Sequence, residues 1–320
     1  MEVTEYHEII TDEKEKTALK NIKNTLATII EEKDKSLITP SLLTNDDLLI
    51  HFLRARKLDI QKTKIMILKY LHWLKDTNVE DIYLNFKIPN MEELKLYYLH
   101  AYHKTSKEGC PIFIQFIGEI DVEKLFELIS SSDLSKYSTK LYSTMERELF
   151  PSCSKAFNKY IHGLVSIIDF NKMTKNMFNK KLRNLVENDL SICQNYFPEC
   201  LNKAVVINAG ILFKTAYALC KPFIDSKTRS KVHIFNDDYK KFLLTIIDEE
   251  NLPTFLGGKC TCDNFVYGCL GSDIGPWKKA ENETVSEEIR KKRWDVMVKK
   301  FGEDVMKGIK SQKKVNLLPP

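Results

Sequence analysis

Four short runs of apolar, largely β-branched residues follow one another after residue 100, and they constrain the fold of this 320-residue chain most strongly. About 25 to 50 residues separate successive runs, which is enough for a helical crossover each time. Runs that are apolar on both sides are typical of a sheet that is covered on both faces or closed over a pocket. We therefore expect residues 101–275 to form an α/β domain with a mostly parallel sheet. The runs are PIFIQFI (111–117), LVSII (164–168), AVVI (204–207) and VHIF (232–235).

The chain before this domain has helical periodicity from about residue 12 to residue 100. Asn45 and Asp46 are N-cap candidates, because their short side chains can accept hydrogen bonds from the first N–H groups of a helix. A second amphipathic segment, IQKTKIMILKYLHWLKD, begins at Ile60. We interpret residues 1–40 as an N-terminal helical extension and residues 41–100 as a small helical domain.

One expected helix, Ala209–Asp225, is more widely apolar than a single buried face requires. Periodicity alone favours a deeply packed crossover helix, and the alternative is a movable lid that faces lipid when it opens. Pro222 would bend or end the helix. Its apolar positions are Leu212, Phe213, Ala216, Tyr217, Leu219, Cys220 and Phe223.

The positive charge of the chain is concentrated near its C-terminal end. Residues 290–314 carry a charge of +7, whereas the whole chain has a net charge of +5, so the remainder is slightly acidic. This distribution is not typical of a nucleic-acid-binding body. A capping box at Thr284 and Glu287 begins an amphipathic helix within residues 276–320, which suits either an anionic membrane surface or packing against the body.

The cysteines and histidines do not form a familiar metal motif. Cys260, Cys262 and Cys269 could hold a metal on paper, but no histidine pair or second C-x₂-C has a matching spacing. We expect these cysteines to be free thiols, with no bound metal. His100 and His103 are expected to be surface polar residues.

Motifs of enzymes are also missing from the sequence. It contains no phosphate-binding loop, no dinucleotide fingerprint, no nucleophile elbow and no H-E-x-x-H. The first residues have no signal-peptide pattern, and no run of 18 apolar residues occurs. We therefore expect a non-catalytic, cytosolic protein without a cofactor.

An ordered set of local motifs goes further than composition. LLIHFLRARKLDIQKTK, YHKTSKEGCPIFI, IIDF, CQNYFPE, INAG, CKPFIDSKTRSKVHIF, NLPTFLGG and SDIGPW occur in this order between about Asp46 and Trp277. Together they resemble the CRAL-TRIO family, and in particular its secretory-pathway phosphatidylinositol/phosphatidylcholine transfer proteins. The resemblance implies a mostly parallel sheet that floors an apolar pocket, with a hinged gate helix that opens at a membrane.

The resemblance also implies a site for the inositol-phosphate head group. The arginine of the RARK motif is Arg56, the glutamate after Tyr-Phe-Pro is Glu199, and the threonine and lysine after the gate helix are Thr228 and Lys231. Cations and acceptors of this kind suit a phosphodiester and a ring of hydroxyls.

The corresponding site for choline lipid is less complete. Tyr102 and Tyr142 match two tyrosines of the family, and Phe113 replaces a third. On the strand that carries hydroxyls in the family, the positions are Leu164 and Ser166. A leucine cannot donate to a phosphate, so we expect phosphatidylinositol binding and leave phosphatidylcholine open.

The implied function is transfer of phospholipid between membranes by a monomer that associates peripherally with Golgi or endosomal membranes. Presentation of the lipid to a phosphoinositide kinase would follow from such a role. The alternatives are a lipid-sensing regulatory scaffold without transfer, and a carrier of another apolar cargo such as a retinoid or tocopherol.

Overall fold

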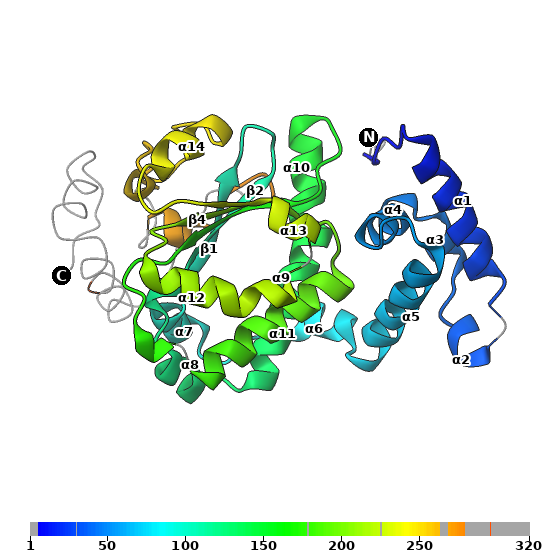
Figure 1. The fold of residues 1–320 in the computed structure, drawn as a ribbon, viewed down its shortest axis with the longest axis horizontal. Helices are drawn as coiled ribbons and strands as arrows, with labels where there is room; N and C mark the ends of the chain where they lie inside the picture. The colour runs from blue at the N-terminus through cyan, green and yellow to red at the C-terminus, as the bar shows by residue number, and fades with distance from the viewer. Residues whose placement is uncertain are drawn as a thin grey trace.

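A five-stranded mixed sheet is the centre of the fold (Figure 1). The computed structural model describes residues 6–29, 31–177, 179–224, 226–262 and 268–278, together with Asp295. The strand order is β1-β2-β3-β4-β5, in which β1 is antiparallel to β2 and the other pairs are parallel. The prediction of an α/β domain with a mostly parallel sheet is therefore confirmed. The strands are β1 His100–Thr105, β2 Pro111–Phe116, β3 Leu164–Asp169, β4 Leu201–Ile207 and β5 Val232–Ile234.

The two faces of the sheet bury different side chains, because successive residues of a strand point to opposite sides. On β2, Ile112 and Ile114 enter the main hydrophobic core, whereas Phe113 belongs to a second cluster on the other face. On β3, Val165 and Leu164 divide in the same way. One face thus packs against a solid core, and the opposite face is free to line a cavity.

Helices cover both faces of the sheet. The solid core includes α14 (Tyr239–Ile246), and Figure 1 shows α12 (Ile211–Cys220) and α11 (Lys180–Tyr196) on the opposite side. The other helices around the sheet are α7 Met91–Tyr97, α8 Val122–Leu128, α9 Ser131–Thr144, α10 Phe150–Phe157, α13 Ser226–Ser230 and α15 Cys269–Ser272. A π-helical turn, Met145–Leu149, joins α9 to α10, and 3₁₀ turns occupy Ile117–Glu119, Lys175–Met177, Lys221–Phe223 and Thr254–Leu256.

The first N-terminal helices form a bundle with its own core. They are α1 Glu13–Ala27, α2 Glu32–Lys35, α3 Pro40–Thr44, α4 Asp46–Ala55 and α5 Ile60–Asp76, and the next helix, α6 Val79–Asn85, contacts α9. Asn45 caps α4 by accepting a hydrogen bond from the N–H of Leu48 at 3.0 Å, as its position in the sequence predicts. Ile22 of α1 packs in one cluster with Leu49 and Phe52 of α4, so the bundle core spans the expected boundary at residue 40.

The C-terminal segment expected to form a basic amphipathic helix lies outside the described residues, apart from Asp295 and residues 276–278. This includes the capping box at Thr284 and Glu287. Within the part of the chain that is described, no helix combines the length and the apolar composition needed to cross a bilayer.

Candidate functional site

A cavity of about 1160 Å³ lies on the face of the sheet opposite the solid core. It exceeds the roughly 300–1,000 Å³ of ordinary small-molecule pockets. Pocket-facing side chains of β3 and β4 form its floor, among them Ile168, Ala204 and Val206. Side chains of the surrounding helices, such as Leu141 and Leu185, form its walls. Most of this lining is apolar, so the cavity suits a hydrocarbon cargo.

All four residues expected to bind an inositol lipid line this one cavity. Arg56 is the C-cap residue of α4, and Glu199 follows α11 with a positive φ of 64°. Thr228 lies on α13, and Lys231 immediately precedes β5. The tertiary structure therefore brings together side chains from the N-terminal bundle, from the β3–β4 crossover and from the β4–β5 connection.

Glu199 is the centre of the charge pattern in this group. Its carboxylate lies 2.8 Å from Nζ of Lys227 and 3.5 Å from Nζ of Lys231. Burial would raise the pKa of Glu199, but the hydrogen bond from Lys227 and the two lysine charges outweigh it, so the pKa lies below its ordinary value. The site thus contains an ionised carboxylate between two cations. Sequence analysis missed Lys227, which adjoins the matched residues and also lines the cavity.

The residues expected to bind a choline lipid line a neighbouring part of the cavity. The rings of Tyr102 and Phe113 lie 4.6 Å apart, centre to centre. The hydroxyl of Tyr142 donates to Oδ2 of Asp189 at 3.1 Å. Leu164 and Ser166 project from β3 into the same space.

Asp189 is a polar residue of the pocket that sequence analysis missed. Burial raises its pKa above the ordinary value, although hydrogen bonds from Ser138 and Tyr142 oppose this shift. It comes from α11, where the sequence offers only amphipathic helical periodicity as a signal. No local pattern distinguishes this carboxyl from a solvent-exposed one.

The prediction that His100 and His103 are surface residues is wrong. They are 6% and 0% exposed, because β1 is covered on both sides. Nδ1 of His100 lies 3.0 Å from the carbonyl oxygen of Tyr98, which can only accept, and Nε2 lies 2.6 Å from the hydroxyl of Tyr137. Burial lowers the pKa of His100 to about 4.

α12, the expected gate helix, lies over the cavity, and most of its described side chains are exposed or half-buried. Phe213 is buried and lines the cavity with Tyr217, whereas Ile211 is 86% exposed. The physical reason is that a hollow lies beneath this helix in place of solid core. The side chains of Ala216, Leu219, Cys220 and Phe223 lie outside the described ones, although Leu212 is half-buried.

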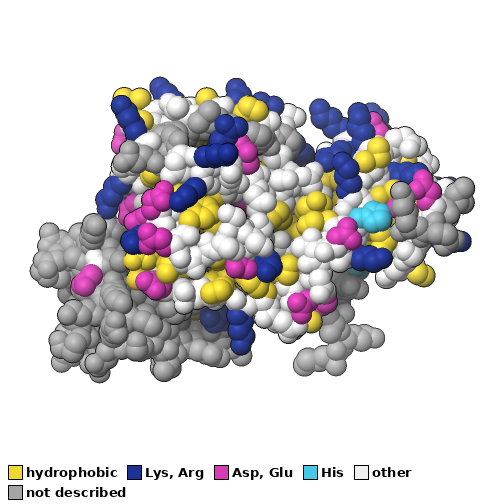
Figure 2. Space-filling view, turned by 90° about the horizontal axis from the view of Figure 1, so that it is seen from below, with side chains coloured by type: hydrophobic (Ala, Val, Ile, Leu, Met, Phe, Trp, Pro, Cys, Tyr) yellow, Lys and Arg dark blue, Asp and Glu magenta, His cyan; other side chains and the backbone are white. Residues whose placement is uncertain are grey.

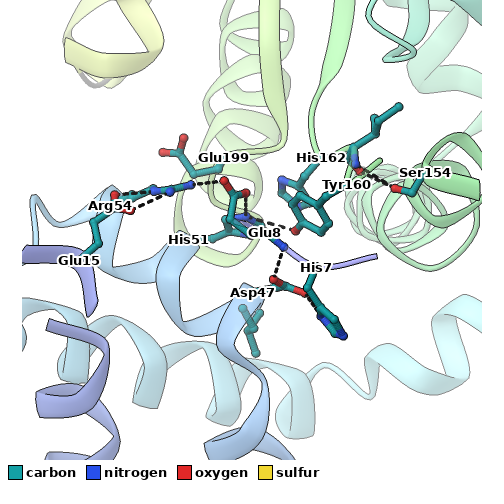
Figure 3. A network of polar contacts seen from close by, with 12 residues as sticks. His7, Glu8, Glu15, Asp47, His51, Arg54, Ser154, Tyr160, His162 and Glu199 are labelled. Carbon is teal, nitrogen blue, oxygen red and sulfur yellow. Dashed lines mark hydrogen bonds and ion pairs between the residues drawn. The ribbon is translucent and has the colours of Figure 1, made fainter. Parts of the chain in front are cut away.

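Helix α4, whose C-cap residue is Arg56, is attached to the sheet domain by a polar network (Figure 3). The rings of His51 and His162 lie 4.0 Å apart, and Nε2 of His162 lies 3.0 Å from Glu146. Burial would lower the pKa of His162, but the Glu146 carboxylate raises it overall. In the bundle, Arg54 pairs with Glu15 at 2.7 Å and with Glu8 at 3.1 Å. These contacts fix the end of α4 at the rim of the cavity.

Comparison with known proteins agrees with this architecture. The family described as CRAL/TRIO domain matches residues 95–258. The phosphatidylinositol/phosphatidylcholine transfer protein SFH7 of Arabidopsis thaliana is 39% identical over 74% of this chain and 44% of its own length. The Sec14 cytosolic factor of Schizosaccharomyces pombe is 34% identical over 74% of this chain and 82% of its own length.

The chain spans less than half the length of SFH7 and of SFH12, and it covers 46% of SFH12 at 36% identity. The crystal structure of Sfh5 has a TM-score of 0.58 to this chain at 16% identity, and the match covers 92% of this chain and 99% of that one. At that identity, the structural match supports the fold alone. Family match, relatives and fold agree: the chain belongs to the CRAL/TRIO family and has phosphatidylinositol/phosphatidylcholine transfer proteins among its homologues.

Proposed function

We propose that this protein carries single phospholipid molecules between membranes, with phosphatidylinositol as its principal cargo. The observation that carries this proposal is the joint presence of Arg56, Glu199, Thr228 and Lys231 at one cavity whose remaining lining is mainly apolar. The names of the relatives also support it. This chain covers 82% of the Sec14 cytosolic factor and 44% and 46% of two phosphatidylinositol/phosphatidylcholine transfer proteins.

The physical need for such a carrier is clear. Each CH₂ group that leaves a bilayer for water costs about 0.8 kcal/mol, and two acyl chains contain dozens of them. The cavity replaces that water with apolar walls, while the polar cluster compensates the head group for lost hydration. In this proposal no bond is made or broken, because loading and release are exchanges between pocket and bilayer.

α12 is the element that we propose to move. It covers the cavity through Phe213 and Tyr217, and its first residue, Ile211, projects an apolar side chain outward. Contact of this helix with a membrane would let it leave the cavity without exposing apolar surface to water. Figure 2 shows hydrophobic side chains in patches among polar and charged ones on the face seen from below.

Phosphatidylcholine is the proposed second cargo, with Tyr102, Phe113 and Tyr142 as candidates to contact the quaternary ammonium through their aromatic faces. Leu164 removes a hydroxyl that this lipid would use, so we expect weaker loading than for phosphatidylinositol. The proposal also includes the partner and the place of action. The protein would act as a monomer and would present its cargo to a phosphoinositide kinase at a Golgi or endosomal surface.

The test combines bound lipid with transfer. Mass spectrometry of lipid that co-purifies with the full chain should find about one phospholipid per protein with phosphatidylinositol enriched, and labelled phosphatidylinositol should move between vesicle populations faster when the protein is added. Bound lipid without accelerated transfer would identify a sensor, a bound retinoid or tocopherol would identify another cargo, and release of phosphate or fatty acid would identify an enzyme. Each of these results would overturn the proposal.

A further inference from the structure

Three cysteines and one buried histidine converge at the edge of the sheet away from the phospholipid cavity. His103 belongs to β1, Cys260 and Cys262 follow the 3₁₀ turn Thr254–Leu256, and Cys269 begins α15. One ligand atom from each residue lies within 4.8 Å of all the others. No second group of three or more His, Cys, Asp or Glu residues with this geometry occurs in the described part of the chain.

The spacing matches tetrahedral zinc. Zn–S bonds of about 2.3 Å and Zn–N bonds of about 2.0 Å place neighbouring ligand atoms roughly 3.5–3.8 Å apart. Sγ of Cys260 and Sγ of Cys262 are 3.6 Å apart, and Sγ of Cys262 is 4.0 Å from Nδ1 of His103. These two distances lie within a few tenths of an ångström of the tetrahedral values, and all four ligand atoms lie within 4.8 Å of one another.

The fold buries the histidine of this group. His103 is fully buried, and its Nε2 has no hydrogen-bond partner among the described residues. Nδ1 is the ring nitrogen that lies nearest the thiols, so it is the candidate ligand atom, and Nε2 then carries the proton. Nδ1 faces Cys262 and also the hydroxyl of Ser272 at 3.3 Å, but that hydroxyl can donate instead to the carbonyl of Cys269.

The local backbone delivers the two cysteines of the C-T-C segment to this position. Gly257 has a φ of 90°, and a Cβ at Gly258 would collide with the backbone of Leu252. The N–H of Cys260 then donates to the carbonyl of Leu252 at 3.0 Å. Glycine at both positions therefore lets the chain turn tightly before Cys260.

We propose that His103, Cys260, Cys262 and Cys269 bind one Zn²⁺ ion as a closed, structural site. The three thiols lose their protons to solvent when they bind, and the complex then carries a net charge of −1. The Lys104 ammonium interacts with all three cysteines and offsets this charge. Four protein ligands leave no position for substrate, which is the mark of a structural rather than a catalytic zinc.

The metal would fasten the segment around α15 to the edge of the sheet. The N–H of Lys104, next to His103, donates to the carbonyl of Ile274 at 2.7 Å, so the two segments already share a backbone hydrogen bond. Tyr102, which directly precedes His103 in β1, lines the phospholipid cavity. Zinc would thus hold the strand that supports one wall of the pocket, independently of which lipid the pocket takes.

Zinc content of the full chain tests this directly. The protein is purified with reduced thiols, equilibrated with Zn²⁺, and passed through a desalting column, and its metal is measured by elemental mass spectrometry. We expect about one zinc per chain in the wild type and a loss of at least about fivefold in Cys262→Ser and in His103→Ala. Cobalt in place of zinc should give the visible absorption of a tetrahedral thiolate complex.

The chain contains a matched control. Cys193 and Cys200 form another close pair, with their sulfurs 3.4 Å apart, but no third cysteine or histidine among the residues that the structure describes completes a group there. Cys193 is half-buried, as Cys262 is. Cys193→Ser should therefore keep its full zinc content. If it loses zinc as Cys262→Ser does, the assignment of ligands is wrong.

Three further results would overturn the proposal. The wild-type protein could bind no zinc after equilibration, or its unreduced peptides could show a disulfide between two of the three cysteines. Both ligand variants could also keep their full zinc content. Where a variant fails to fold, the wild type still decides: the cobalt spectrum must show thiolate coordination, and a mercurial titration must release zinc as three thiols react. Octahedral cobalt, or zinc release that does not follow the thiols, refutes the site.

Discussion

Nζ of Lys231 lies 3.5 Å from Oε2 of Glu199, and the same lysine donates to the carbonyl of Leu201 at 2.6 Å. The ammonium is thus held in place by the strand beside it. In the proposed function, this fixed ammonium would bind the phosphate of the lipid. Lys227 would then keep Glu199 ionised, because it pairs with the same carboxylate.

Lys231→Ala should weaken loading of phosphatidylinositol. Loss of a charge-assisted hydrogen bond to phosphate costs about 1.5–3 kcal/mol, which corresponds to roughly a tenfold to hundredfold lower affinity. Lys203→Ala is the control, because Lys203 is a half-buried lysine of β4 that pairs with Glu108 at 3.8 Å. Competition between labelled and unlabelled lipid measures both variants. Equal loading of the two would remove Lys231 from the head-group site.

Ala204→Trp should block the cavity without unfolding the protein. Ala204 is 5% exposed and lies on the cavity floor, so the indole would enter empty space and would not overpack a filled core. We expect several-fold less phospholipid to co-purify, with an unchanged circular dichroism spectrum. Ala27→Trp, at an exposed position of α1, is the control. Normal loading in Ala204→Trp would show that the cargo lies elsewhere.

Leu164→Thr should raise the share of phosphatidylcholine among bound lipids. The new hydroxyl can donate to a phosphate oxygen inside the cavity, and a bond of this kind is worth about 1–3 kcal/mol when its loss leaves a buried group unpaired. Leu164→Val has nearly the same shape as the threonine variant and no hydroxyl. If valine raises the choline share as much as threonine does, cavity size controls selection and the hydroxyl does not.

Ile211→Ser should slow lipid transfer while leaving bound lipid in place. Ile211 is 86% exposed at the start of α12, and burying such a side chain in a membrane is worth about 1.5–3 kcal/mol. Vesicle flotation should therefore show about tenfold weaker membrane association. Leu84 is 62% exposed on α6, so Leu84→Ser provides a matched loss of exposed apolar surface. The idea fails if both variants slow transfer equally.

Stability should fall in mild acid because of His100. Its pKa in the folded protein is about 4, below the value of about 6.5 in an unfolded chain, so between these pH values the unfolded chain binds a proton that the folded chain does not. The free energy of unfolding should decrease by about 3 kcal/mol as the pH falls through this window. Below pH 4 the loss from this group is complete.

Urea unfolding from pH 7 to pH 4 measures this contribution. His100→Gln should be less sensitive to pH across the window, because glutamine does not titrate. His233→Gln, at a half-buried histidine of β5, serves as the control and should keep the wild-type dependence. Parallel curves for wild type and His100→Gln would assign the acid sensitivity to other groups.

β1 is the one strand of the sheet that the apolar runs of the sequence do not predict. The other four strands are apolar runs, and they were predicted within a few residues of their bounds. β1 has the sequence HAYHKT, and its polar composition hides a strand of which five of six residues are buried. The fold can bury His100 because both ring nitrogens have partners, the nearby carbonyl of Tyr98 and the hydroxyl of Tyr137, and only the tertiary structure brings Tyr137 there.

Spacing along the chain does not indicate which residues gather around the cysteines. Cys260, Cys262 and Cys269 have no histidine nearby in sequence, and the residue that lies with them within 4.8 Å is His103, from the first strand of the sheet domain. Spacing rules detect metal sites built from one local segment. They cannot detect a site assembled from an edge strand and a distant turn.

The sequence by itself determined the elements, because alternation, helical periodicity and caps act between near neighbours: α5 begins at Ile60 and ends at Asp76 as its pattern predicts, and Asn45 caps α4. Only the tertiary structure decided that α12 covers a hollow, that Arg56 and Lys231 line the same cavity, and that His103 is fully buried. A cavity is space that side chains from many segments leave unfilled. No single segment encodes it, because its volume depends on how all of them pack.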